Sequence, residues 1–318
     1  MKNFCITGAT GFIGCELNKK LKRQECNVYE LSKDFLSSLE VNSLDEYKSK
    51  KNIPVIDCVV HLAARAHVLV ETELNPEDLF NKINFLMVKQ LIQSCKYAKI
   101  KNFIFISSIG VCGTNSINPF DEESICKPEE AYAASKLKAE KYLIEYCNDN
   151  NINLIILRFP LVYGPNVKGN FEKLILRVNK SKFLPFGLAN KNKRSFLSVH
   201  NACDSIMNIL FNSNFLNEDK FYELFIVSDK EQVSTKELIL LISKGLNKKC
   251  YLLPIPMSFM KLIFLIIGKN KVYKKVFGSL QVNSEKFYSN YNYEPKINIY
   301  DGILEMSKLW KLKNDTNI

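Results

Sequence analysis

Tyr132 and Lys136 are the two residues whose types and spacing best suit a proton-transfer reaction. Four positions apart on a helix, their side chains share one face, so the lysine ammonium can lie beside the phenol. A free phenol has a pKa of about 10, and a neighbouring positive charge favours its ionised form. The tyrosine can then donate and accept protons near neutral pH. A helix that carries the pair by chance is the alternative, and the surrounding motifs decide between the two.

The stretch from Phe103 to Ser108 predicts the strand at whose end this chemistry takes place. It is a short apolar run that ends in two hydroxyls, as expected of a buried parallel strand. Open α/β sheets bind ligands at the carboxyl ends of their strands. Ser108 is therefore expected at the ligand-binding edge.

A glycine-rich turn follows the first apolar run of the chain, at residues 2–7. Glycines allow a tight turn and a close approach of the backbone to a pyrophosphate, and the helix that follows points its first N–H groups at the phosphates. This order of strand, glycines and helix is more specific than the glycines alone. The dinucleotide site is predicted at Gly8, Thr10, Gly11, Phe12, Ile13 and Gly14.

Strand and helix patterns alternate through the first half, which predicts an α/β fold with a doubly wound, parallel, Rossmann-type sheet. Strands are expected near residues 2–7, 26–31, 56–62, 102–108 and 152–158, and helices near 12–24, 78–98 and 130–148. Residues 1–160 are predicted to form the dinucleotide-binding domain. Residues 161–318 are predicted to form a smaller, basic α/β domain that binds the substrate, and segments of the two are expected to interleave.

Two helices are predicted in the second half from local signals. Ser234 and Glu237 have the spacing of a capping box, which starts a helix. Tyr300 to Leu312 has the spacing of an amphipathic helix, with Trp310 expected in the core rather than in a site.

The net charge of +11 comes from the second half of the chain. Residues 1–160 hold 20 basic and 20 acidic side chains, whereas residues 161–318 hold 24 and 13. A basic second half fits an anionic ligand such as a nucleotide diphosphate, an acidic membrane surface, nucleic acid, or merely solvated lysines. A nucleic-acid binder would interleave basic residues with exposed aromatics, but most aromatics here fall in apolar runs, so no nucleic-acid partner is expected.

Ten cysteines and three histidines are scattered without a Cys-x-x-Cys pair. This pattern fits neither a metal site nor a disulfide framework, so we expect no metal and buried thiols in a reducing cytoplasm. The chain leads straight into the first strand, and we expect a cytoplasmic protein without a signal peptide. The longest apolar stretch, residues 251–267, is interrupted and too short to span a bilayer.

Gly8-x-x-Gly11-x-x-Gly14, Ser108 and Tyr132-x-x-x-Lys136 together resemble the extended short-chain dehydrogenase/reductase family, the NAD-dependent epimerases and dehydratases. Within that family the chain is similar to the branch that acts on carbon 4 of UDP-sugars. The branch includes UDP-glucose 4-epimerase-like enzymes and UDP-4-keto-6-deoxy-N-acetylhexosamine reductases. Further support comes from residues 61–68, 163–171, 194–196, 278–280 and 293–295.

The resemblance implies a different role for each candidate residue. Tyr132 would exchange a proton with the sugar C4 oxygen, and Ser108 would hydrogen-bond the same oxygen. Lys136 would lower the pKa of the tyrosine and anchor the nicotinamide ribose. Cofactor contacts are implied at Leu62, Ala63, Ala64, Asn84 and Phe159, and substrate contacts at Arg65, His67, Asn170 and Arg194.

His61, Asn84 and Arg194 could each have a structural role in place of a binding role. His61, in the same segment as the alanines, is expected to be a packed core histidine. Asn84 either steadies the catalytic strand or lies exposed on the helix near 78–98. Arg194 either grips the diphosphate with its forked guanidinium or is a surface cation on an edge strand.

The residue after the second strand indicates the cofactor, because an acidic side chain there binds the adenosine ribose and repels a 2′-phosphate. Alignment with the family places Ser32 at this position, followed by Lys33. A hydroxyl and an ammonium favour NADP(H) slightly over NAD(H). A shift of one or two residues would bring Glu30 or Asp34 there and reverse the preference.

Two reactions use the same machinery, and the sequence leaves both open: C4 epimerisation and reduction of a 4-keto sugar, either of them serving surface polysaccharide synthesis. Related dehydratases carry an Asp-Glu pair directly after the catalytic hydroxyl, but Ile109 and Gly110 stand there, which argues against dehydration. A lipid-diphosphate-linked sugar is an alternative substrate. A non-catalytic, NADP-sensing Rossmann protein is the alternative from another class. A homodimer is expected.

Lysines bracket the apolar stretch 259–267, at positions 248, 249, 269, 271, 274 and 275. Such a segment can rest on an anionic membrane surface and give weak peripheral contact through residues 248–275. Packing as a core helix with solvated lysines is the favoured interpretation.

Overall fold

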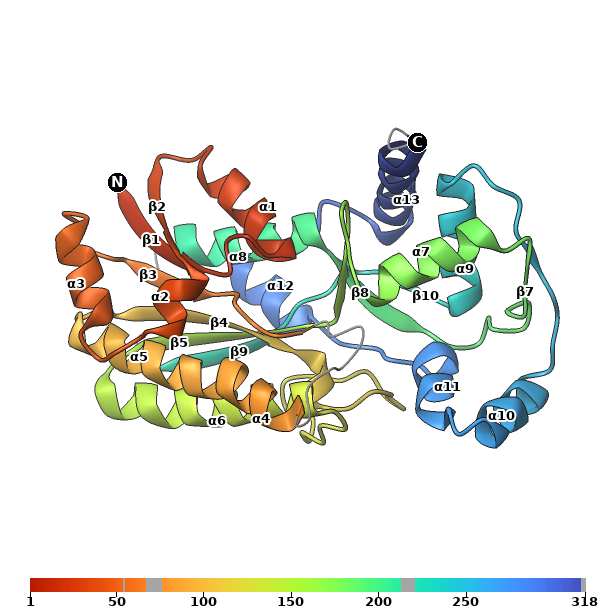
Figure 1. Ribbon diagram of the computed structural model, residues 1–318, viewed down its shortest axis with the longest axis horizontal. Helices are drawn as coiled ribbons and strands as arrows, with labels where there is room; N and C mark the ends of the chain where they lie inside the picture. The colour runs from red at the N-terminus through yellow and green to blue at the C-terminus, as the bar shows by residue number, and fades with distance from the viewer. Residues whose placement is uncertain (54, 67–75, 213–220, 316–318) are drawn as a thin grey trace.

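The computed structural model describes residues 1–53, 55–66, 76–212 and 221–315 (Figure 1). Its main sheet has six strands in the order β2-β1-β3-β4-β5-β9. Every neighbouring pair is parallel, which confirms the predicted Rossmann-type α/β fold. The strands are β1 (Lys2–Thr7), β2 (Cys26–Leu31), β3 (Cys58–His61), β4 (Asn102–Ser108), β5 (Asn153–Phe159) and β9 (Tyr222–Ile226).

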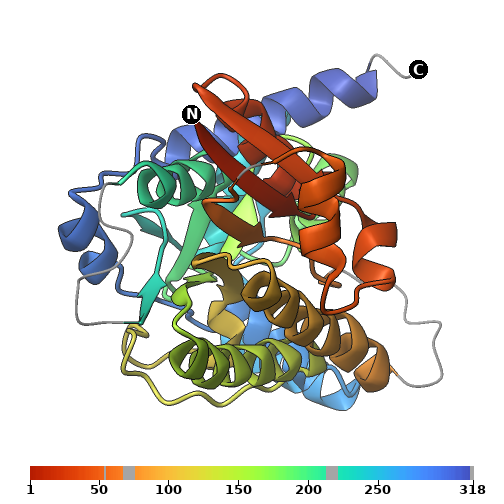
Figure 2. The same ribbon diagram turned by 90° about the vertical axis from the view of Figure 1, so that its left-hand side faces the viewer.

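Helices cover both faces of the main sheet because its central strands are apolar on both sides. One face packs against α1 (Phe12–Leu21), α8 (Val199–Phe211) and α12 (Glu285–Tyr291). The other face packs against α2 (Lys33–Ser37), α3 (Ser43–Lys50), α5 (Met87–Tyr97) and α6 (Ala131–Asn150). Figure 2 shows these two helical layers from the end of the sheet. Strand β9 and helices α8 and α12 come from the second half of the chain.

A smaller group of elements packs around a second core. Strand β8 (Arg194–Ser198) lies between β6 (Leu161–Tyr163) and β10 (Gln232–Val233), and β7 (Phe183–Leu184) pairs with β11 (Tyr251–Leu252). The helices are α7 (Asn170–Lys180), α9 (Thr235–Gly245), α10 (Met257–Ile266), α11 (Asn270–Phe277) and α13 (Ile299–Asp315). The predicted capping box is present at the start of α9, and Trp310 of α13 packs against this second core.

Two predicted helices differ in detail from expectation. The single helix expected near 78–98 is divided into α4 (Pro76–Asn81), a π-helical turn at Lys82–Leu86 and α5. A π-turn inserts one extra residue per turn and often marks a functional position. Helix α10 is not the core helix that was favoured, because Met260 is its one buried residue among many exposed apolar ones.

Candidate active site

The carboxyl ends of β4 and β5 carry the centre of the candidate site. Ser108 is the last residue of β4 and pairs in register with Phe159, the last residue of β5. The Ser108 Oγ accepts a hydrogen bond from the Gly110 backbone N–H at 3.1 Å. A Cβ built on Gly110 would lie 3.3 Å from Ser108 Oγ and 3.5 Å from Ala133 Cβ, so little space separates the serine from the first turn of α6.

Tyr132 and Lys136 both belong to the start of α6, as predicted, but their side chains point to different neighbours. The Lys136 Nζ donates to the Ile106 carbonyl of β4 at 2.7 Å and lies 4.3 Å from the Phe105 ring centroid. The Tyr132 ring packs edge-on against Phe80 of α4, with ring centroids 6.3 Å apart. The Lys136 side chain therefore points to β4 and not along α6 to the Tyr132 phenol.

This arrangement sets the ionisation of the pair. Burial lowers the pKa of Lys136 to about 7, and the nearby Glu140 carboxylate opposes that fall. Burial raises the pKa of Tyr132 to about 12. The expectation that Lys136 lowers the tyrosine pKa is wrong for this structure, because the ammonium is bound to a strand carbonyl. Tyr132 is accordingly protonated at neutral pH and is ready to donate.

Asn84 occupies the π-helical turn and is fully buried, so the exposed alternative is wrong. Its amide oxygen accepts from the Arg65 backbone N–H at 2.8 Å, and its Nδ2 donates to the Arg65 carbonyl and to Ser135 Oγ, each at 3.1 Å. The Ser135 hydroxyl in turn donates to the Tyr132 carbonyl at 2.7 Å. Asn84 thus ties the loop after β3 to the first turn of α6.

The loop after β3 brings one more predicted residue to the tyrosine. The Arg65 guanidinium carbon lies 5.8 Å from the centroid of the Phe80 ring, which itself contacts Tyr132. Sequence reasoning missed Phe80, whose position two residues before the π-helical segment gave no signal. His67 lies outside the described residues.

His61 is a core residue, as predicted. It is 1 % exposed, and its ring stacks on Phe103 and Phe105. Its Nδ1 lies 2.9 Å from Thr7 Oγ1. Burial, with a smaller contribution from Lys136, lowers the pKa of His61 to about 3, so the imidazole is neutral.

The turn between β1 and α1 has the shape that a dinucleotide pyrophosphate needs. Gly8 has a φ of +70°, and a Cβ on it would lie 2.7 Å from the Ala63 backbone nitrogen. A Cβ on Gly14 would lie 2.0 Å from the Gly8 carbonyl oxygen. Gly11 caps α1 without a side-chain hydrogen bond, so the first N–H groups of the helix remain available to an anion. The predicted residues from Gly8 to Gly14 and from Leu62 to Ala64 meet at this turn.

Ser32 lies at the end of β2 and caps α2, where its Oγ accepts from the Phe35 backbone N–H at 3.1 Å. Lys33 follows and is exposed. Glu30, the rival for this position, is held elsewhere: its Oε1 accepts from Asn18 Nδ2 at 2.5 Å and from Lys22 Nζ at 3.2 Å. Both partners lie at the far end of α1 from the glycine turn.

Arg194 opens β8 and is half-buried. Its Nη1 donates to the Gly278 carbonyl at 2.9 Å, and burial lowers its pKa to about 10. Among the described residues no carboxylate forms an ion pair with it. Strand β8 lies between β6 and β10, so the alternative of a surface cation on an edge strand is wrong. Asn170 is exposed in the first turn of α7, directly after Gly169, whose φ is +73°.

A buried ion pair behind Lys136 was also missed. The Arg158 Nη2 donates to Glu140 Oε2 at 2.7 Å and its Nε to Glu140 Oε1 at 3.1 Å. Both residues are almost fully buried. The spacing could have found Glu140, because it lies four residues after Lys136 and so shares its helical face.

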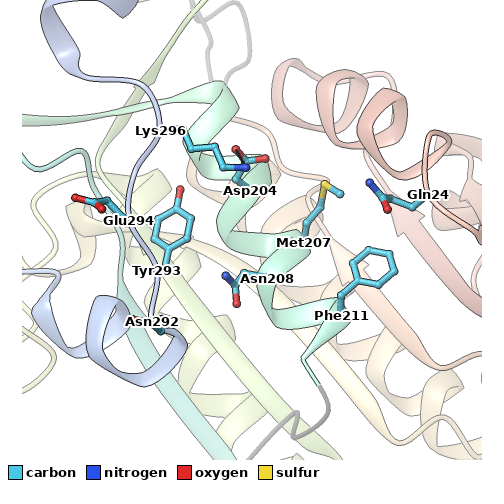
Figure 3. A pocket seen from close by; sticks show the side chains of 9 residues that line it. All are labelled: Gln24, Asp204, Met207, Asn208, Phe211, Asn292, Tyr293, Glu294 and Lys296. Carbon is cyan, nitrogen blue, oxygen red and sulfur yellow. Dashed lines mark ion pairs between the residues drawn. The ribbon is translucent and has the colours of Figure 1, made fainter.

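A hollow of about 420 Å³ lies apart from this site, between α8 and the segment that follows α12. Figure 3 shows its lining, with Lys296 and Asp204 forming an ion pair at 3.9 Å. None of the predicted site residues lines it. The hollow is therefore not part of the candidate active site.

Comparison with known proteins places the chain in a family. The profile of the NAD dependent epimerase/dehydratase family matches residues 4–223. A UDP-glucose 4-epimerase of Vibrio cholerae is 32% identical over 99% of this chain and 97% of its own length. The N-acetyl-alpha-D-glucosaminyl-diphospho-ditrans,octacis-undecaprenol 4-epimerase of Escherichia coli O157:H7 is 28% identical over 78% of this chain and 73% of its own.

Solved structures agree on the fold. RMD from Pseudomonas aeruginosa, solved as a complex with NADPH, has a TM-score of 0.75 and 20% identity, and the match covers 98% of this chain and 100% of that one. A family profile that spans more than half of the chain and a curated relative that spans nearly all of it lead to one conclusion. The chain belongs to the NAD-dependent epimerase/dehydratase family.

Proposed function

We propose that the protein is a sugar-nucleotide enzyme that moves hydride at C4 of a UDP-hexose or UDP-N-acetylhexosamine, with C4 epimerisation as its reaction. The observation that carries this proposal is the meeting of Ser108 and the first turn of α6 at the strand ends beside the glycine turn. The Vibrio cholerae relative named UDP-glucose 4-epimerase supports the choice of reaction.

Each proposed catalytic residue has a defined task. The nicotinamide, when bound, supplies the hydride acceptor and donor for C4. Tyr132 gives its phenolic proton to the C4 oxygen in one direction and takes it back in the other. Ser108 hydrogen-bonds the same oxygen and fixes its position. The phenolate needs a nearby positive charge, and Lys136 lies one helical turn away but donates to the Ile106 carbonyl. The mechanism therefore requires its ammonium to turn toward the phenolate during the reaction.

Glycine packing and backbone shape support the proposed cofactor site. Gly8, Gly11 and Gly14 hold the turn close to Ala63, and the uncapped start of α1 faces the pyrophosphate. Ser32 and Lys33 favour NADP(H), because Glu30 is engaged with α1 and is not free to bind a ribose hydroxyl.

Reduction of a 4-keto sugar is the second candidate, because it needs the same residues and an NADP(H) preference favours it. Dehydration is disfavoured, since Ile109 is buried and apolar where related dehydratases have an acid. A lipid-diphosphate-linked sugar is the third, favoured by the Escherichia coli relative whose name specifies such a substrate. A role in surface polysaccharide synthesis fits each of these substrates.

Product analysis decides between the reactions. Purified protein is incubated with UDP-glucose, UDP-GlcNAc, UDP-GalNAc or a UDP-4-keto-6-deoxy sugar, with and without added NADPH. An epimerase interconverts C4 isomers without net consumption of NADPH, whereas a reductase consumes one NADPH per keto sugar. Tyr132→Phe serves as the matched control, with an expected loss of ~10²–10⁴-fold in rate. Wild-type turnover by this variant would contradict the proposed mechanism.

A further inference from the structure

Helix α10 turns most of its apolar side chains toward solvent. Met260 is buried in a small cluster with Ala189 and Phe277. Phe259, Leu262, Leu265, Ile266 and Ile267 are all more than half exposed. The spacing of Phe259, Leu262, Leu265 and Ile266 places these four on the helix face away from Met260, and Ile267 directly follows the last residue of α10. Single exposed apolar residues are ordinary, but a contiguous helical face of them indicates a binding surface.

Positive charge surrounds this apolar face. Residues 238–284 contain eight lysines and neither aspartate nor glutamate. Five of the lysines lie on or between α10 and α11: Lys261, Lys269, Lys271, Lys274 and Lys275. Figure 1 shows both helices at the end of the molecule remote from β1 and β2. We call the five exposed apolar residues together with these lysines the α10–α11 surface.

We propose that the α10–α11 surface binds an anionic membrane leaflet, with α10 lying in the interface. Its apolar side chains would enter the boundary between headgroups and acyl chains while the lysines contact anionic headgroups. Helix α10 has ten residues and is therefore about 15 Å long, so it can lie on a bilayer but not cross it. None of the helices in the described part of the chain is long and apolar enough to traverse one.

Charge favours a lipid leaflet over a second copy of the chain as the occupant. Two copies joined through this surface would bring their lysines together, and among the described residues Lys275 is the one of the five with an ion-pair partner, Glu130. Like charges that face each other across an interface oppose association. An anionic leaflet supplies the missing negative charge and the apolar phase at once.

The surface adjoins the candidate active site. The carbonyl of Gly278, directly after α11, accepts the Arg194 hydrogen bond. Lys275 of α11 pairs with Glu130, the residue before α6. Membrane binding would therefore hold Arg194 and the start of α6 beside the leaflet. The proposed binding does not depend on which reaction the site performs.

Flotation of the full-length protein with liposomes tests the proposal. The vesicles are phosphatidylcholine alone or an equal mixture with phosphatidylglycerol, each at low and high salt. We expect binding to the anionic vesicles that weakens at high salt, because salt screens the lysines. Leu262→Glu should weaken this binding at least about tenfold. Val41→Glu is the matched control, because Val41 and Leu262 are each 51% exposed and Val41 lies outside the surface.

Charge is tested separately from apolar contact. Loss of each lysine near the leaflet is expected to weaken binding about fivefold. The Lys271→Glu, Lys274→Glu double variant should therefore bind at least about 25-fold more weakly than wild type. Unchanged thermal unfolding would show that these exposed substitutions leave the fold intact.

Three results would overturn the proposal. The first is no flotation with anionic vesicles at low salt. The second is equal flotation of the Leu262→Glu and Val41→Glu variants. The third is a dimer in sedimentation that Leu262→Glu dissociates while vesicle binding is absent, which would assign the surface to contact between two copies.

Discussion

Arg158 and Arg194 both lie at strand ends, yet within the described residues only Arg158 has an anionic partner. Arg158 is 4 % exposed and makes two hydrogen bonds to the Glu140 carboxylate. Burial alone would lower its pKa, but the Glu140 hydrogen bonds and charge outweigh burial and raise the pKa above its ordinary value. Arg194 donates to a backbone carbonyl, and burial lowers its pKa to about 10.

The difference supports the proposal that Arg158 stabilises the fold and that Arg194 binds a ligand. A buried cation is costly unless an anion neutralises it. Arg158 is neutralised within the chain, whereas Arg194 keeps its charge in a low-dielectric setting where an incoming diphosphate would be bound strongly. We therefore expect the buried Arg158 to matter chiefly for stability and the half-buried Arg194 to matter chiefly for binding.

The largest expected effect follows from removing the anion that neutralises Arg158. Glu140→Gln should lower the free energy of unfolding by about 3–5 kcal/mol, because it leaves a buried guanidinium without a counter-charge. Arg194→Met, the matched control at the other arginine, removes a charge that has no such partner and should change stability by less than about 1 kcal/mol. Urea denaturation of both variants measures the difference. Equal losses at the two positions would break the comparison.

The same Arg194→Met variant should show its effect in ligand binding. Hydrogen bonds to charged groups contribute about 1.5–3 kcal/mol each, so affinity for UDP should fall by roughly 10- to 150-fold. Arg194→Lys keeps the charge but cannot form two parallel hydrogen bonds to a phosphate. Its affinity for UDP should lie between those of the wild type and Arg194→Met. Calorimetric titration with UDP is the measurement, and thermal unfolding with the dinucleotide serves as the control. UDP affinity equal to wild type would place the diphosphate elsewhere.

The two arginines also show which features of the structure could be predicted from the sequence. Five strands of the main sheet, the glycine turn and the capping box at Ser234 depend on local patterns, and each was predicted within a few residues, whereas strand β9 was not predicted. The pairing of Arg158 with Glu140 depends on tertiary contact between β5 and α6, which no local pattern records. Only the spacing of Glu140 from Lys136 hinted at a shared face.

Two other features, the direction of the Lys136 side chain and the exposure of helix α10, differ from what the sequence predicted. Lys136 was expected to turn to Tyr132, but the Ile106 carbonyl offers a buried ammonium a partner at 2.7 Å. Helix α10 was expected in the core because it is apolar, but the helices that pack in the second core are α7, α9 and α13, and Met260 of α10 belongs to a separate small cluster. The apolar composition of a helix predicts that it is removed from water, but it does not show whether protein or lipid covers it.

Lys136 extends the comparison to a third buried cation. Its pKa in the folded protein is about 7, below that of a free lysine, about 10.4. Between these values the unfolded chain binds a proton that the native protein does not, so stability rises with pH across this window. Relative to Lys136→Met, the free energy of unfolding of the wild type should increase by about 1.4 kcal/mol between pH 8 and 9.

Guanidinium denaturation of both proteins without cofactor, at pH 6, 8 and 9, measures this difference. Subtracting the variant removes the contributions of thiols and phenols, which titrate in the same range. A difference that stays constant with pH would show that Lys136 keeps its proton, as Arg158 does. Lys136 would then resemble Arg158, a buried side chain that stays charged.

The smallest expected effect concerns a cation at the proposed cofactor site. Lys33 is exposed beside Ser32, and together they would accept the 2′-phosphate of NADP(H). Ser32→Asp should shift the preference toward NAD(H) by about tenfold, because a carboxylate repels the phosphate and accepts from a free ribose hydroxyl. Aspartate is also a good helix cap, so the bond to the Phe35 N–H and the fold should survive. Ser32→Asn keeps the cap without the charge and is the control. Dissociation constants for both cofactors, measured by fluorescence, give the ratio. An unchanged ratio in Ser32→Asp would remove Ser32 from the cofactor site and leave Arg194 as the phosphate-binding cation of the comparison.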